Sequence, residues 1–148
     1  MGTAAIDFFS KQEKEEIQMA IMNAELDTSG EIRVHMENNF TGDVMDRAAF
    51  IFKHLEMNKT ELRNGVLIYL AVKNRRFAII GDSGIHKVVP ENFWDDIKAK
   101  MLNHFREGRF ADGLVEAINN AGLQLKSHFP RQKNDVNELT DEISFGKD

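Results

Sequence analysis

The 148-residue chain has 19 Lys and Arg residues against 24 Asp and Glu residues, a formal net charge of −5, and 42% hydrophobic residues. A chain of this length can bury a sizeable core as one domain, and it contains no cysteine, which excludes disulfides, thiolate nucleophiles and cysteine-based metal sites. The acidic balance makes nucleic-acid binding unfavourable, and no apolar window is long enough to span a membrane. Because the first residues lack a signal-peptide pattern, we expect a cytoplasmic protein.

The N-terminal third predicts a helix, a strand and a second helix. Ser10 and Glu13 form a capping box, and apolar residues then recur with a helical period as far as Leu26. Residues 31–37 alternate between apolar and polar side chains, which is typical of a half-covered strand and suggests an edge position in a sheet. After the cap Asp43, a second amphipathic helix is expected.

The uncharged residues 65–72 predict the central strand of the fold. This run of Gly, Ala, Val, Leu, Ile and Tyr is too short for an ordinary helix, and it indicates a strand buried on both faces. After the polar residues 73–75, a second apolar run over 77–80 predicts an antiparallel hairpin. The order strand, helix, strand makes the first two strands parallel.

Two more helices are predicted before the composition changes. Pro90 occupies the place of a first helical residue, and Gly108 is the expected stop. A further apolar stripe runs from Leu114 to Pro130 and contains Gly122, which predicts a close crossing with another backbone. The expected fold is therefore a three-layer α/β/α sandwich with a small mixed sheet, formed by a parallel β-α-β unit plus an antiparallel hairpin.

We assign residues 1–129 to one domain and residues 130–148 to a polar tail. Such a composition is typical of a flexible, solvated segment. The alternative is that residues 142–145 add to a sheet edge or bind a partner, so that a protein partner would be engaged through residues 136–148.

Four short pieces, in this order and spacing, carry a resemblance to a known family. They are residues 25–34 (ELDTSGEIRV), 64–68 (NGVLI), 76–85 (RFAIIGDSGI) and 105–114 (FREGRFADGL). Together they resemble the TPM domain family, which includes a plant thylakoid-lumen protein described as an acid phosphatase and linked to photosystem II repair. The resemblance implies a mixed sheet between helical layers, and it also implies calcium binding and phosphatase activity.

The predicted topology places three loops at one end of the sheet, and loops that converge in this way often form ligand sites. Carboxylates there are candidate ligands for Ca²⁺ or Mg²⁺, and an arginine there is a candidate for holding phosphate. The predicted metal ligands are Asp27, Glu31 and Asp82, with Asp95 and Asp96 as alternatives, and the predicted catalytic residues are Glu31, Arg63 and Asp82.

A purely structural interpretation competes with this site. Asp82 would then build a turn, Glu31 would begin a strand, and the two helix carboxylates would favour a helix N-terminus. No spacing matches an EF-hand, the five histidines form no helical zinc pair, and most of them are expected at the surface. We therefore predict a binding or accessory module with a divalent-cation site. The alternative is a metal-assisted acid phosphatase acting on phosphomonoesters.

Overall fold

A computed structural model describes residues 5–90, 92–131 and 141–146. The elements follow in this order along the chain: α1 (Ala5–Phe8), α2 (Lys11–Glu25), β1 (Glu31–Glu37), α3 (Val44–His54), the 3-10 turn η1 (Met57–Lys59), β2 (Gly65–Ala71), β3 (Arg76–Gly81), α4 (Ser83–His86), α5 (Asp95–Arg106), α6 (Phe110–His128) and β4 (Ser144–Phe145).

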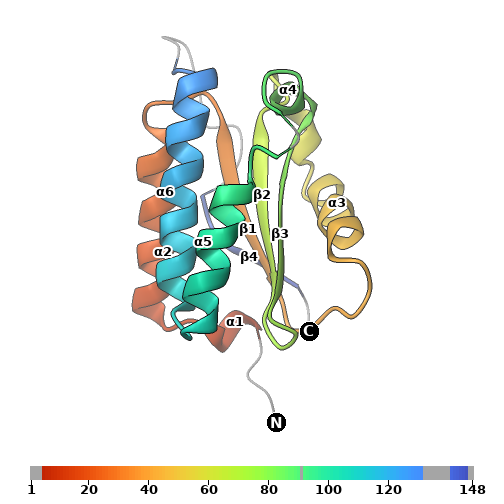
Figure 1. The fold of residues 1–148 in the computed structure, drawn as a ribbon, viewed down its shortest axis with the longest axis vertical. Coiled ribbons are helices and arrows are strands. Elements are labelled where there is room, and N and C mark those ends of the chain that lie inside the picture. Colours follow the sequence, from red (N-terminus) through yellow and green to blue (C-terminus); the bar gives the residue numbers. More distant parts are fainter. Residues whose placement is uncertain (1–4, 91, 132–140, 147–148) are drawn as a thin grey trace.

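The strands form a mixed sheet in the order β3-β2-β1-β4. Strand β1 pairs in parallel with both β2 and β4, whereas β3 is antiparallel to β2. Figure 1 shows α2, α5 and α6 on one side of this sheet and α3 on the other. The predicted three-layer α/β fold with a mixed sheet is thus confirmed.

Strand β2 is the centre of the fold, because all seven of its residues are buried. Its even-numbered side chains, such as Ile68, belong to the large apolar core under α2, α5 and α6. Its odd-numbered side chains, Leu67 and Tyr69, belong to the smaller core under α3. A strand with two apolar faces needs cover on both sides, and this requirement organises the three layers.

Local signals place two helices as predicted. The Ser10 hydroxyl accepts the Glu13 N–H at 3.1 Å, and the Glu13 carboxylate accepts the Ser10 N–H at 2.9 Å, so the capping box opens α2. Gly122 of α6 lies against Ala24 of α2, where a Cβ at position 122 would come within 2.6 Å of the alanine Cβ. The predicted close crossing is therefore confirmed.

Two predictions about the elements are wrong. Strand β1 is not an edge strand, because β4 pairs with it through His35 and Met36. Helix α5 begins at Asp95 rather than after Pro90, since the N–H groups of Phe93 and Asp95 close two tight turns just before it. Where the structural interpretation placed a turn at Asp82, the structure has the one-turn helix α4, and the Asp82 carboxylate accepts its first N–H, that of Ser83.

Part of the polar tail docks on the sheet. We call residues 141–146 the C-terminal segment; it includes β4, and Ile143 within it is buried in the large core. Of the two expectations for the tail, addition to the sheet is therefore the one that this segment shows. Residues 136–140, 147 and 148 of the predicted partner-binding stretch lie outside the described residues. No helix in the described part is long and apolar enough to cross a membrane.

Candidate functional site

The predicted convergence of three loops at one end of the sheet is confirmed. The register pairs Glu31 with Gly65 and Val66 with Gly81, so the loops before β1, before β2 and after β3 meet there. We call this the acidic end of the sheet. Its buried polar residues are Glu25, Thr28, Glu31, Thr60, Asn64 and Asp82. Polar side chains are seldom buried without a partner, so a cluster of six buried polar residues calls for an explanation. This end is therefore the first candidate for a ligand site.

Asp82 and Arg63 form an ion pair at the acidic end. Arg63 Nε lies 2.7 Å from one carboxylate oxygen of Asp82, and Nη2 lies 3.0 Å from the other. The Asp82 carboxylate also accepts the Ser83 N–H at 2.7 Å, which begins α4. Asp82 is 6% exposed, whereas the Arg63 side chain is 47% exposed. The structure therefore brings these two predicted residues together, with Asp82 fixing the guanidinium.

The other predicted ligands are not gathered around Asp82. Asp27 is 71% exposed, and one of its carboxylate oxygens lies 3.8 Å from Lys126 Nζ on α6. Asp95 and Asp96 occupy the first turn of α5. Within residues 5–90, 92–131 and 141–146, no three His, Asp or Glu side chains are arranged so that they could hold a metal ion as they stand.

A second group of carboxyl groups lies beside Glu31. Glu25 is buried at the end of α2, and its Oε2 accepts the Ile32 N–H at 2.8 Å. Its side chain also shares a hydrogen bond with Asp141 of the C-terminal segment. Burial, this hydrogen bond and the charges of Asp141 and Glu31 together raise the pKa of Glu25 to about 9. Glu25 is therefore protonated at neutral pH.

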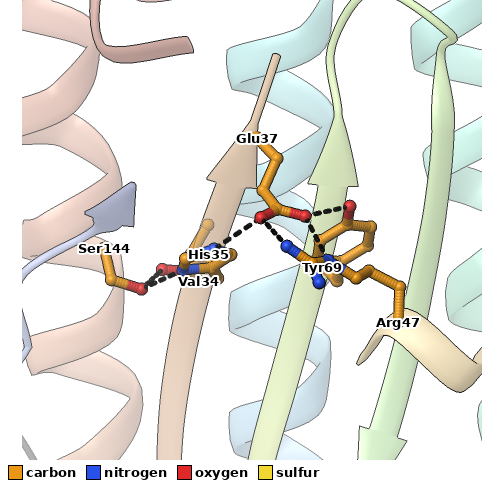
Figure 2. A network of polar contacts seen from close by, with 6 residues as sticks. All are labelled: Val34, His35, Glu37, Arg47, Tyr69 and Ser144. Atoms are coloured by element: carbon orange, nitrogen blue, oxygen red, sulfur yellow. Dashed lines mark hydrogen bonds and ion pairs between the residues drawn. The ribbon is translucent and has the colours of Figure 1, made fainter. Parts of the chain in front are cut away.

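A third polar group lies on the α3 side of the sheet. Figure 2 shows Glu37 of β1 between Arg47 of α3 and Tyr69 of β2. Arg47 Nε and Nη2 donate to the Glu37 carboxylate at 2.8 and 2.6 Å, and the Tyr69 hydroxyl donates to it at 2.6 Å. Burial alone would raise the pKa of Glu37, but these hydrogen bonds outweigh it and lower the pKa. The ionised carboxylate thus joins α3 to two strands.

His35 extends this network to the C-terminal segment (Figure 2). It is 4% exposed, an exception among the five histidines, most of which lie at the surface as predicted. Its Nδ1 lies 2.7 Å from the Ser144 hydroxyl, which is also 3.3 Å from the Val34 carbonyl. Burial lowers the pKa of His35, so the ring is neutral at pH 7. Its Nε2 is 3.7 Å from Glu37 Oε2, which is too far for a hydrogen bond. A buried, neutral ring whose close polar contact is with Ser144 argues for a structural role of His35.

Comparison with known proteins places the chain in a family. The family model of the TPM domain matches residues 3–124. The chain belongs to the TPM domain family. Among curated proteins, none matches this TPM domain.

Solved structures include relatives of this TPM domain. It is 46% identical to the BA42 protein of the psychrophilic bacterium Bizionia argentinensis, with a TM-score of 0.88 over 94% of this chain and 96% of that one. An N-terminal domain from P. gingivalis is 20% identical, with a TM-score of 0.68 over 82% of this chain and 78% of that one. The N-terminal domain of cg2496 from Corynebacterium glutamicum is 15% identical, with a TM-score of 0.66 over 89% and 82%. The last two show a common fold alone.

Three of the four sequence pieces that carry the family likeness meet at the acidic end of this TPM domain, and the fourth, residues 105–114, joins α5 to α6. Residues 25–34 lead from α2 into β1, residues 64–68 begin β2, and residues 76–85 run from β3 into α4. The family match stops at residue 124, so the C-terminal segment lies beyond it. The pairing of Glu25 with Asp141 could not be predicted from the sequence, because 116 positions separate the two residues and no local signal connects them.

Proposed function

We propose that this TPM domain is a binding module that takes up a divalent cation, Ca²⁺ or Mg²⁺, at the acidic end of its sheet. The observation that supports this is the buried carboxyl of Glu25, which shares a hydrogen bond with Asp141 and lies close to the charge of Glu31. Oxygen atoms of carboxylates are the ligands that these two cations prefer.

The proton in the hydrogen bond between Glu25 and Asp141 reduces the repulsion between their carboxyl groups, and a bound cation would do the same. Two carboxyl groups can share a hydrogen bond only while one of them is protonated, and the raised pKa of Glu25 reflects this arrangement. A divalent cation relieves the same repulsion when it replaces the proton, and its binding is then stronger at higher pH. Because the side chains do not yet form a complete site, Asp141 would have to move toward Glu31 on binding.

This ligand set differs from the one predicted from the sequence. Glu31 belongs to both, but Asp82 already holds Arg63 and Asp27 points to Lys126. The proposal therefore replaces Asp27 and Asp82 by Glu25 and Asp141, and substitutions can separate the two sets.

Adding 10 mM Ca²⁺ at pH 8 is expected to raise the melting temperature of the full chain. With a dissociation constant on the order of 0.1 mM, the stabilisation is about 2.7 kcal/mol, which corresponds to roughly 5–10 °C for a chain of this size. Glu25→Gln, which keeps the shape and cannot ionise, should abolish the shift. Differential scanning fluorimetry with an EDTA blank measures it.

The control for this titration is Asp82→Asn, which should keep the calcium-dependent shift because Asp82 is paired with Arg63. A shift that is lost in Asp82→Asn and kept in Glu25→Gln would favour the ligands predicted from the sequence instead. If the wild-type chain shows no shift with either cation between pH 6 and 9, the cation proposal is wrong.

Phosphomonoester hydrolysis is the second function that we propose, and Arg63 is the observation that favours it. Asp82 fixes the guanidinium through two hydrogen bonds, yet half of the Arg63 side chain remains exposed at the acidic end. A fixed, exposed guanidinium suits a phosphate group. In this proposal Arg63 binds the phosphate, Asp82 orients Arg63, and Glu31 is a cation ligand. The cation would supply an activated water.

Hydrolysis of a chromogenic phosphate ester at pH 5 and pH 7 tests this second function. We expect turnover that depends on Ca²⁺ or Mg²⁺ and falls at least roughly tenfold in Arg63→Ala and in Asp82→Ala, a loss typical of a misplaced binding group. Asp27→Ala is the matched surface control. Turnover that is absent, or that survives both substitutions, would remove Arg63 and Asp82 from any catalytic role.

The cytoplasmic location of the protein stays a prediction from the sequence.

A further inference from the structure

The C-terminal segment contacts the domain with alternate residues on the two faces of the sheet. On the α2 side, Asp141 shares its hydrogen bond with Glu25, and Ile143 is 7% exposed in the large apolar core. Phe145 packs against the same core, and the ammonium group of Lys14 lies 5.4 Å from its ring centroid. The odd-numbered positions of the segment thus meet a carboxyl group, an apolar pocket and a cation.

The even-numbered positions meet polar groups on the α3 side. Glu142 attracts the partly buried guanidinium of Arg33, and this charge opposes the lowering of the Arg33 pKa by burial. Ser144 places its hydroxyl 2.7 Å from His35 Nδ1 (Figure 2). Acidic and hydroxyl side chains at these two positions are therefore matched by groups on β1.

The last position leaves little room for a side chain. The Gly146 N–H donates to the Met36 carbonyl at 2.8 Å, which continues the backbone pairing of β4 with β1. A Cβ at position 146 would come within 3.0 Å of the Glu37 side chain, which the network around Arg47 holds in place. The segment is thus matched at each of its six positions, rather than held by backbone pairing alone.

We propose that the outer edge of β1 is a binding site for an extended peptide of this pattern, and that a second copy of the chain supplies the same segment in place of the chain's own. The pattern is acid, acid, aliphatic, serine, aromatic, glycine. Addition of a strand to a sheet edge is a recurrent way to bind peptides, with side-chain pockets that give specificity. The site shares the Glu25–Asp141 contact with the proposed cation site, so it is tested without divalent cations, and it does not involve Arg63.

The C-terminal segment has little backbone pairing with the rest of its own chain, and this favours its exchange between two copies. Only two residues of β4 pair with β1, and the segment lies beyond the part of the chain that the family match covers. Exchange of one identical element costs little, since the contacts in the two arrangements are the same. The chain's own segment competes at an effective concentration in the millimolar range, so exchanged dimers should form at comparable protein concentrations.

A labelled peptide with the sequence of residues 140–148 tests the site on the full chain, in EDTA. In the variant Ile143→Asp the chain's own segment would have to bury a charge and should leave the edge of β1 free. The peptide should then bind this variant at least roughly tenfold more tightly than the wild-type chain, whose own segment competes. Fluorescence anisotropy measures both affinities.

Two further measurements decide the outcome. A peptide carrying Gly146→Val should not bind, and the full chain with Gly146→Val, which leaves the core unchanged, should bind the wild-type peptide as Ile143→Asp does. Sedimentation equilibrium of the wild-type chain near millimolar concentration should show dimers that Gly146→Val lacks. Absence of peptide binding to both variants would overturn the site. Peptide binding by a chain that stays monomeric would overturn the second copy as its occupant.

Discussion

Replacing Glu37 by alanine is expected to lower the free energy of unfolding by about 3 kcal/mol, the cost typical of breaking a buried ion pair from one side. The carboxylate accepts two hydrogen bonds from Arg47 and one from Tyr69, all between 2.6 and 2.8 Å. Without it, a guanidinium and a phenol that are largely removed from water lose their partner.

Urea unfolding of the full chain at pH 7, followed by circular dichroism, measures this loss. Tyr69→Phe is the matched control, because it removes one hydrogen bond to Glu37 and leaves the ion pair; we expect it to cost about 1 kcal/mol. If Glu37→Ala proved no more costly than Tyr69→Phe, the network would not join α3 to the sheet in the way proposed.

Those parts of the fold that depend on neighbouring residues could be predicted from the sequence. The uncharged run at β2 dictated a strand with two covered faces, and the order of strands and helices fixed the parallel pairing with β1. The capping residues of α2 and α3 marked where those helices begin. Each of these signals lies within a few residues, so a single sequence contains all the information needed.

The parts that depend on distant residues could not be predicted. The alternation in β1 is typical of an edge strand, but the polar side chains at 33, 35 and 37 are covered in part by the C-terminal segment, more than 100 positions away. For the same reason His35 looked like a surface residue. The sequence brought Glu31, Arg63 and Asp82 to one end of the sheet correctly, because topology alone decides that. It could not show that Asp82 would be engaged by Arg63.

Replacing Gly84 by alanine is expected to destabilise the acidic end by about 3 kcal/mol, at the upper end of the range for overpacking. The new Cβ would come within 2.1 Å of the Leu62 carbonyl oxygen and 2.6 Å of the Arg63 carbonyl oxygen. These are backbone atoms and cannot rotate away. The loop that holds Arg63 must therefore shift, and the Arg63 N–H groups then leave Asp82. Thermal unfolding measures the total loss of stability. A change in the NMR signals of the Arg63 side chain would show that the structural change lies in the loop that holds Arg63.

The sign of this effect separates packing from backbone preference. Gly84 lies within α4 without a positive φ, where alanine is intrinsically better than glycine by about 1 kcal/mol, so any destabilisation must come from the collision. Gly108 provides the opposite case, because its φ is +74° and a Cβ there would meet no atom within 4 Å. Gly108→Ala should therefore cost only the strain of the left-handed conformation, about 1 kcal/mol. A Gly84→Ala chain as stable as the wild type would mean that the loops at Arg63 and Asp82 are not in close contact, and the phosphate-binding role proposed for Arg63 would lose its geometric basis.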